Sequence, residues 1–175
     1  HQVGKNDTAV DLITKALTIK PDYAEAHSNL GLALQALGKS EDAIASYHKA
    51  LAIKPDLAVA HNNLGNALKD QGKLEEAVAS YHKVLAIDPI FAKAHYKLGL
   101  TLQELGRGEA IKSFRHAVSL NPKNDLFWTG LAACVETCSF TSADDQLWKD
   151  LLFLLEWPKT RASQLIRPII SALLH

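Results

Sequence analysis

Small and apolar residues recur along this chain in pairs of runs, each with the spacing of a helix that buries one face. The first run carries four residues at the i, i+3, i+4, i+7 positions of one helix face: His27, Leu30, Gly31 and Leu34. The second run, from Ala43 to Leu51, places its small and aromatic residues in the same way. The pattern therefore predicts pairs of amphipathic helices.

Residues at the ends of these runs predict where each helix begins and ends. Gly38 is expected to end the first helix, and Ser40 to cap the second by accepting a hydrogen bond from its free amides. Pro55 is expected to end the second helix. Near the start of the chain, Asn6 or Asp7 is expected to cap an earlier helix.

The helix pairs repeat with a period of 34 residues. The segment from Ala24 to Gly31 returns at Ala58–Gly65 and again at Ala92–Gly99. The second half, from Ala43 to Pro55, returns at 77–89. A fixed period of this length is typical of stacked supersecondary units, which bury their apolar stripes against their neighbours.

Within the unit, several small, aromatic and proline positions resemble those of the tetratricopeptide repeat: Leu30, Gly31, Ala43, Tyr47, Ala50 and Pro55. The resemblance covers about residues 5–133. It implies an all-α fold, a right-handed superhelical solenoid of antiparallel helix pairs with C-terminal capping helices. The asparagines at equivalent positions, Asn29 and Asn63, are similar to the asparagine ladder of the O-linked N-acetylglucosamine transferase repeats.

The repeat pattern also predicts the domain organisation. The array is expected to span residues 1–138, as a half repeat 1–21, full repeats 22–55, 56–89 and 90–122, and a degenerate first helix 125–138. The first helix, which has no partner helix in this sequence, is expected to be frayed, exposed or covered by another molecule. Residues 139–175 are expected to form a helical cap, with helices at 142–156 and 161–174.

Composition narrows the classes of partner. Nineteen basic and nineteen acidic residues balance, and no basic run is present, so we expect no nucleic-acid binding. No apolar stretch is long enough for a membrane span and no signal-peptide pattern is seen, which favours the cytoplasm and no membrane association. The absence of methionine and the start at His1 suggest a piece of a longer polypeptide. Cys134 and Cys138 are expected to be free thiols.

Histidines are frequent, but their spacing argues against a metal or catalytic site. His27, His61 and His95 recur once per repeat, and neighbouring repeats lie about 10 Å apart, too far for one ion. The resemblance places them in a slot where the family often has tryptophan. No nucleophile-elbow, HExxH, P-loop or GxGxxG motif is present. We therefore expect no catalytic residue, no metal, no cofactor and no enzymatic activity.

The resemblance implies that the first helices of the pairs line a concave groove that holds a peptide. The residues predicted to bind the peptide in this groove are Asn29, Asn62, Asn63, Asn66, Lys69, Lys93, Tyr96 and Lys97. Ser28 and Leu32 are expected to line it as well. Carboxamides both donate and accept, so they can pair with the backbone of an extended peptide of any sequence. The alternative is that these amides only keep the surface soluble.

A second resemblance concerns the carboxylate clamp of chaperone-binding repeats. Asn63, Lys93 and Lys97 match three of its five positions, whereas Ser28 and Leu32 depart from it. Two ammonium groups beside an amide suit an acidic or C-terminal carboxylate. Tyr96 is the expected aromatic anchor.

These observations predict a protein–protein interaction module that binds an extended or C-terminal peptide of a partner protein. One alternative is a scaffold that self-associates into a homo-oligomer through an apolar terminal helix, either 7–19 or 165–174. Another is the non-catalytic N-terminal part of a methyltransferase or glycosyltransferase, because residues 127–174 are similar to the region that follows the repeats in some bacterial proteins of those kinds.

Overall fold

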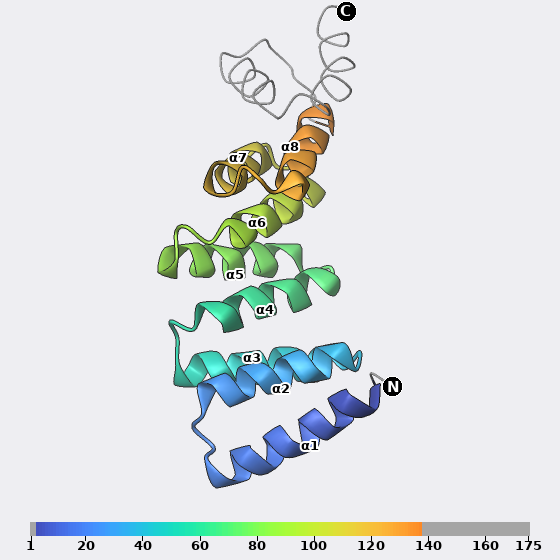
Figure 1. Cartoon of the computed structure of the whole chain (residues 1–175), viewed down its shortest axis with the longest axis vertical. Coiled ribbons are helices and arrows are strands. Elements are labelled where there is room, and N and C mark those ends of the chain that lie inside the picture. The colour runs from blue at the N-terminus through green and yellow to red at the C-terminus, as the bar shows by residue number, and fades with distance from the viewer. Residues whose placement is uncertain (1–2, 138–175) are drawn as a thin grey trace, which may run out of the picture. The chain divides into compact units, whose positions relative to one another are not determined.

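The computed structural model describes the backbone of residues 3–137 and the side chains of residues 6–135, and every regular element in that part of the chain is an α-helix (Figure 1). None of these helices is both long enough and apolar enough to cross a membrane. The predicted helical cap at 139–175 and Cys138 lie outside the described residues.

The chain divides into two compact units, His1–Ala94 and His95–His175. The first unit holds five helices: α1 (Val3–Ile19), α2 (Ala24–Ala36), α3 (Ser40–Ile53), α4 (Ala58–Asp70) and α5 (Leu74–Ile87). Helix α6 (Ala92–Glu104) begins in the first unit and continues into the second, which also contains α7 (Ala110–Leu120) and α8 (Asp125–Thr137). The predicted boundary after residue 138 falls where the described residues end and stays a prediction.

Glycines end the first helix of each pair, as the sequence predicts for Gly38. Gly38 and Gly72 have φ angles of 75° and 72°, in the left-handed region that glycine adopts without strain. The Lys39 amide donates to the Leu34 carbonyl and the Gly38 amide to the Gln35 carbonyl, both at 3.0 Å. These two bonds form a Schellman motif, which satisfies the last carbonyls of α2 and turns the chain toward α3.

Two predicted caps are wrong. Ser40 is the first residue of α3 rather than its cap; Lys39 stands at the cap position, and no side-chain hydrogen bond caps the helix there. The acidic pair Glu41 and Asp42 occupies the first turn instead, where the helix dipole favours negative charge. Helix α1 begins at Val3, so Asn6 and Asp7 lie inside it rather than at its N-terminus.

In the first unit the helix pairs are held by a tyrosine packed on a glycine. Tyr47 of α3 is fully buried, and a Cβ added to Gly31 of α2 would lie 2.6 Å from its ring. Tyr81 of α5 meets Gly65 of α4 in the same way, at 2.7 Å. The glycines are therefore required because an aromatic ring fills the space of their side chains, and this brings the two helices of each pair close together.

Phenylalanine replaces tyrosine in the second unit. Phe114 of α7 is fully buried, and a Cβ added to Gly99 would lie 2.9 Å from its ring. Helix α7 begins at Ala110, three residues later in the repeat than α3, which is where the sequence is one residue short. Helix α8 packs against α7, with Trp128 and Leu131 buried.

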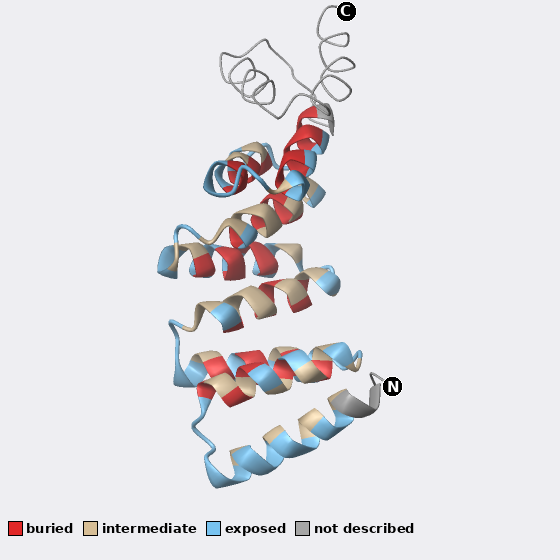
Figure 2. Ribbon diagram, viewed as in Figure 1, coloured by how far each residue is buried: buried red, intermediate tan, exposed pale blue. Residues whose placement is uncertain are grey.

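Helix α1 is the least buried of the described helices. It contacts α2, yet none of its described side chains is buried, and Figure 2 shows it in the exposed and intermediate colours along that length. Leu12 is 61% exposed and Ile19 is 86% exposed. The helix was expected to be frayed, exposed or covered by another molecule, and in this structure its described side chains are exposed or only half-buried.

Candidate peptide-binding face

The first helices of the two pairs in the first unit, α2 and α4, contact each other directly. The sides that carry Gly31 and Gly65 pack against the tyrosines, so the remaining accessible side chains form one surface. We call it the α2–α4 face, and it consists of Asn29, Leu32, Val59, Asn62, Asn63 and Asn66. The structure thus brings together four of the predicted amides.

Two of these amides have their oxygen atoms occupied. The Asn62 Nδ2 group donates to Asn63 Oδ1 at 3.2 Å, and the Tyr81 hydroxyl donates to Asn66 Oδ1 at 2.9 Å. Asn63 and Asn66 are three residues apart and therefore neighbours on one side of α4. Asn29 on α2 is exposed. The amides on α4 are thus held by defined contacts.

A second tyrosine makes the equivalent contact from the other helix pair. The Tyr47 hydroxyl donates to Gln35 Oε1 at 3.1 Å, and Gln35 Nε2 donates in turn to Asp70 Oδ2 at 3.1 Å. This chain of hydrogen bonds joins α3, α2 and α4. Both the oxygen and the NH₂ group of the Gln35 amide are therefore hydrogen-bonded within the first unit.

The tyrosine hydroxyls stay protonated because they are buried. Burial raises the pKa of Tyr47 to about 12. Burial also raises the pKa of Tyr81, with the negative charge of Asp70 adding to the effect. Both hydroxyls are therefore donors at any physiological pH.

Charged side chains lie on α2 and α4 and at the start of α6. Lys69 lies one turn beyond Asn66 on α4 and is half-buried, and Lys93 at the start of α6 is exposed. Glu25 of α2 pairs with Lys54 at 3.1 Å. A backbone hydrogen bond and Lys54 lower the pKa of Glu25, and Glu25 raises the pKa of Lys54.

One predicted lining residue is placed elsewhere. Ser28 of α2 is buried, so it is not among the accessible residues of the face. Leu32, by contrast, is 53% exposed, and Val59 on α4 is 58% exposed. The face therefore offers apolar contact beside its amides.

Tyr96 and Lys97 belong to the second unit. Tyr96 meets Phe114 edge-on, with ring centroids 5.6 Å apart, and Phe127 at a tilt, with centroids 5.1 Å apart. A Cβ added to Gly130 would lie 2.7 Å from the Tyr96 ring, and burial raises the pKa of this tyrosine. Tyr96 thus packs within its unit and presents only part of its ring as the predicted anchor.

The recurring histidines tie each repeat to the one before it. His27 Nε2 lies 2.8 Å from the Pro21 carbonyl oxygen, and His61 Nε2 lies 2.9 Å from that of Pro55. Because a carbonyl only accepts, the proton must sit on Nε2. The structure therefore assigns these histidines a packing role, and residues 6–135 contain no group of three or more metal-ligating side chains that could hold an ion.

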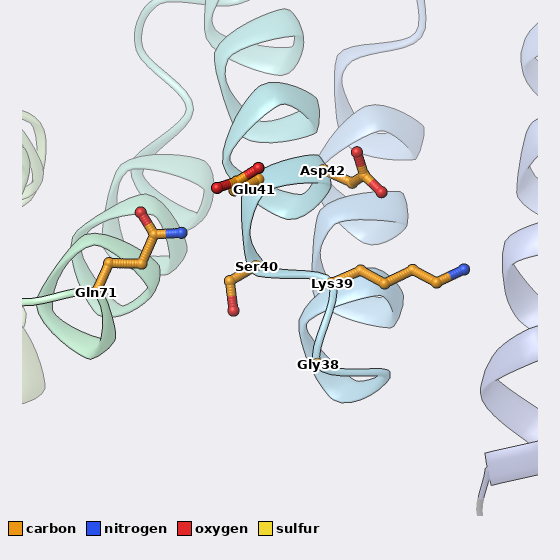
Figure 3. Close-up of a pocket in the computed structure, with 6 residues that line it drawn as sticks. All are labelled: Gly38, Lys39, Ser40, Glu41, Asp42 and Gln71. Atoms are coloured by element: carbon orange, nitrogen blue, oxygen red, sulfur yellow. The ribbon is translucent and has the colours of Figure 1, made fainter.

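Open polar hollows lie away from the α2–α4 face. One, of about 450 Å³, is formed at the α2–α3 turn (Figure 3). It is lined by Gly38, Lys39, Ser40, Glu41, Asp42 and Gln71. Another lies at the α7–α8 turn, around Asn124. Neither contains a residue of the predicted groove.

The spacing of the Ala43–Leu51 run predicts that Tyr47 is buried, but it does not predict the hydrogen bonds of Tyr47 and Tyr81 to amide side chains. The tyrosine hydroxyl indicates that such a contact exists, because a fully buried tyrosine requires a hydrogen-bond partner. Phe114, at the same repeat position, has no hydroxyl and requires none. The partner could not be named, because it is Gln35 in one repeat and Asn66 in the next.

Stacked helix pairs with a polar, accessible face on their first helices define the class of helical-repeat solenoids, whose surfaces bind other proteins. A sequence model described as TPR repeat matches residues 1–38, 34–72 and 65–106, and one described as tetratricopeptide repeat matches residues 92–124. The chain belongs to the tetratricopeptide-repeat family and is a protein–protein interaction module.

Solved structures of other proteins have a similar fold. A crystal structure of MamA matches with a TM-score of 0.75 and 22% sequence identity, covering 96% of this chain and 88% of the MamA chain. A second MamA structure matches with a TM-score of 0.76 and 25% identity, covering 91% and 86%. The TPR domain of Arabidopsis OM64 matches with a TM-score of 0.63 and 24% identity, covering 66% and 96%.

Among curated proteins, no sequence matches this chain. The likeness to the repeats of O-linked N-acetylglucosamine transferase stays a prediction.

Proposed function

We propose that the α2–α4 face binds an extended peptide segment of a partner protein. The observation that carries the proposal is the cluster of accessible amides on two helices that contact each other, with Leu32 and Val59 exposed among them. Amide groups pair with a peptide backbone, and the two apolar side chains give contact area to alternate side chains of the peptide.

We further propose that the peptide is acidic or ends in a free carboxylate. Lys69 and Lys93 supply positive charge in the first unit. Ammonium groups bind carboxylates through charge-assisted hydrogen bonds. A peptide of this chemistry would therefore bind better at low salt than at high salt.

Titration of labelled peptides, followed by fluorescence anisotropy, tests the proposal. The probes are a glutamate-rich peptide and its glutamine counterpart with an amidated C-terminus. We expect the first to bind more tightly, and a Lys69→Ala/Lys93→Ala variant to lose several-fold in affinity and part of the salt dependence.

The matched control is Lys49→Ala/Lys83→Ala, which removes two exposed lysines at one repeat position on the second helices α3 and α5. It should bind as the wild type does. Equal, salt-insensitive affinities for both peptides and all variants would refute the proposal.

Self-association through α1 is the second candidate function, and the exposure of Leu12 and Ile19 favours it. Leu12 and Ile19 are seven residues apart and therefore lie on one side of α1, which is the spacing of a stripe that packs against another helix. Light scattering over a concentration series tests this candidate. A monomer at every concentration, unchanged by Leu12→Ser/Ile19→Ser, would exclude it. The predicted apolar helix at 165–174 lies outside the described residues.

A further inference from the structure

Two amides on α4 have, among the described residues, a hydrogen bond to their oxygen atoms and none from their NH₂ groups. The Oδ1 atom of Asn66 accepts the Tyr81 hydroxyl and the Oδ1 atom of Asn63 accepts from Asn62. Within the part of the chain that the structure describes, neither NH₂ group has a hydrogen-bond partner, and neither is buried. A free asparagine can turn either end toward a ligand, whereas these two offer donors.

Tyr47, at the equivalent position of the preceding repeat, contacts an amide whose NH₂ group is already hydrogen-bonded. Tyr47 and Tyr81 are both 0% exposed, and each donates to an amide oxygen. The NH₂ group of Gln35, however, is used by Asp70, whereas that of Asn66 is not used. The buried hydroxyl thus orients an amide in both repeats, but Asp70 takes up the NH₂ group of Gln35, whereas the NH₂ group of Asn66 remains available as a donor.

We infer that Tyr81 is a positioning residue that orients the side chain of Asn66 so that its NH₂ group faces the ligand, where it selects carbonyl and carboxylate oxygens of an extended acidic peptide. This inference rests on the proposed function and adds a reason for its selectivity. A ligand group that brings a donor, such as a lysine ammonium, gains no hydrogen bond from the NH₂ groups of Asn63 and Asn66.

The spacing of the donors supports an extended ligand. Residues three apart on a helix have Cβ atoms about 5–6 Å apart. Groups on the same side of an extended chain recur every two residues, about 6.5–7 Å. Asn63 and Asn66 can therefore meet successive oxygen atoms on one side of a peptide, and Lys69 lies one turn further along α4.

The test compares Tyr81→Phe with Tyr47→Phe. Both remove one buried hydroxyl from the same repeat position, but only the first frees an amide of the face. Each variant is titrated with the glutamate-rich peptide and with a lysine-rich counterpart, after circular dichroism has shown that it is folded. Asn66→Asp, which retains an acceptor for Tyr81 and removes the NH₂ group, is the third variant.

We expect Tyr81→Phe to weaken binding of the acidic peptide by about three- to tenfold, the effect of one hydrogen bond. The ratio of its affinity for the glutamate-rich peptide to its affinity for the lysine-rich peptide should fall as well. Asn66→Asp should weaken binding by at least as much, and Tyr47→Phe should leave it unchanged. If Asn66→Asp weakens binding but Tyr81→Phe matches Tyr47→Phe, the positioning role is overturned.

Failure of the proposed function gives a different result. If the wild type binds neither peptide, the proposed function and the ligand assigned here both fail. The orientation of Asn66 is still read from its side-chain NH₂ signals in nuclear magnetic resonance spectra of the free protein. These signals should move in Tyr81→Phe and stay in place in Tyr47→Phe; signals that stay in place in both variants overturn the positioning role on their own.

Discussion

The indole Nε1 of Trp128 donates to the carbonyl oxygen of Pro122 at 2.9 Å. His61 makes the same contact with the Pro55 carbonyl, also six residues earlier and also at 2.9 Å. Histidine therefore replaces tryptophan in the first repeats because its ring carries a donor that reaches the same carbonyl. The slot selects an aromatic ring with an N–H group.

This relationship predicts opposite results for two aromatic substitutions at His61. His61→Phe keeps a ring but removes the donor, and should lower the free energy of unfolding by about 1 kcal/mol. His61→Trp restores a donor and should keep wild-type stability. Urea denaturation followed by circular dichroism measures both. A phenylalanine variant as stable as the tryptophan variant would show that the hydrogen bond contributes nothing.

The packing of Tyr81 on Gly65 predicts that a single methyl group is harmful there. Gly65→Ala places a Cβ 2.7 Å from the buried ring, and should destabilise the protein by about 1–2 kcal/mol although alanine favours helices. Gly108→Ala, which meets no atom within 4 Å, should change stability by less than about 0.5 kcal/mol. Thermal unfolding compares them, and equal melting temperatures would contradict the close packing.

A different cause acts at Gly72. No atom lies within 4 Å of an added Cβ, but φ is 72°, so Gly72→Ala should lose about 1–2 kcal/mol through backbone strain alone. Gly72→Asn should lose less, because asparagine tolerates the left-handed region. Chemical denaturation of the two variants tests this order. An alanine variant at least as stable as the asparagine variant would contradict the assigned turn.

Burial of Tyr47 predicts a loss of stability in alkali. An unfolded tyrosine loses its proton near pH 10, whereas burial raises the pKa of Tyr47 in the fold to about 12. Between these values the unfolded state binds fewer protons, so the free energy of unfolding falls as pH rises, and the contribution is complete below pH 10.

Tyr47→Phe should therefore show a shallower decline above pH 10 than the wild type. Denaturation midpoints measured from pH 8 upward test this, with Tyr23→Phe, which removes an exposed hydroxyl, as the control. Parallel declines in the wild type and Tyr47→Phe would contradict the prediction.

Much of the fold follows from local rules that the sequence displays. The period of 34 residues, the small residues at Gly31 and Ala43 and the glycine after each first helix predict the helix pairs and their turns. The caps at Ser40 and Asn6 were predicted wrongly. A serine or asparagine near a helix start can cap the helix or join its first turn, and its own residue type does not decide between them.

The sequence by itself determined the family, the helix pairs, the close packing at the glycines and the presence of amides on the first helices, because each depends on residues within one repeat. Only the tertiary structure decided what those amides offer to a ligand. Their orientation depends on Tyr47, Tyr81 and Asp70, which reach them from neighbouring helices. A hydrogen-bond donor is directional, so its availability is a property of the packed helices and not of the repeat pattern.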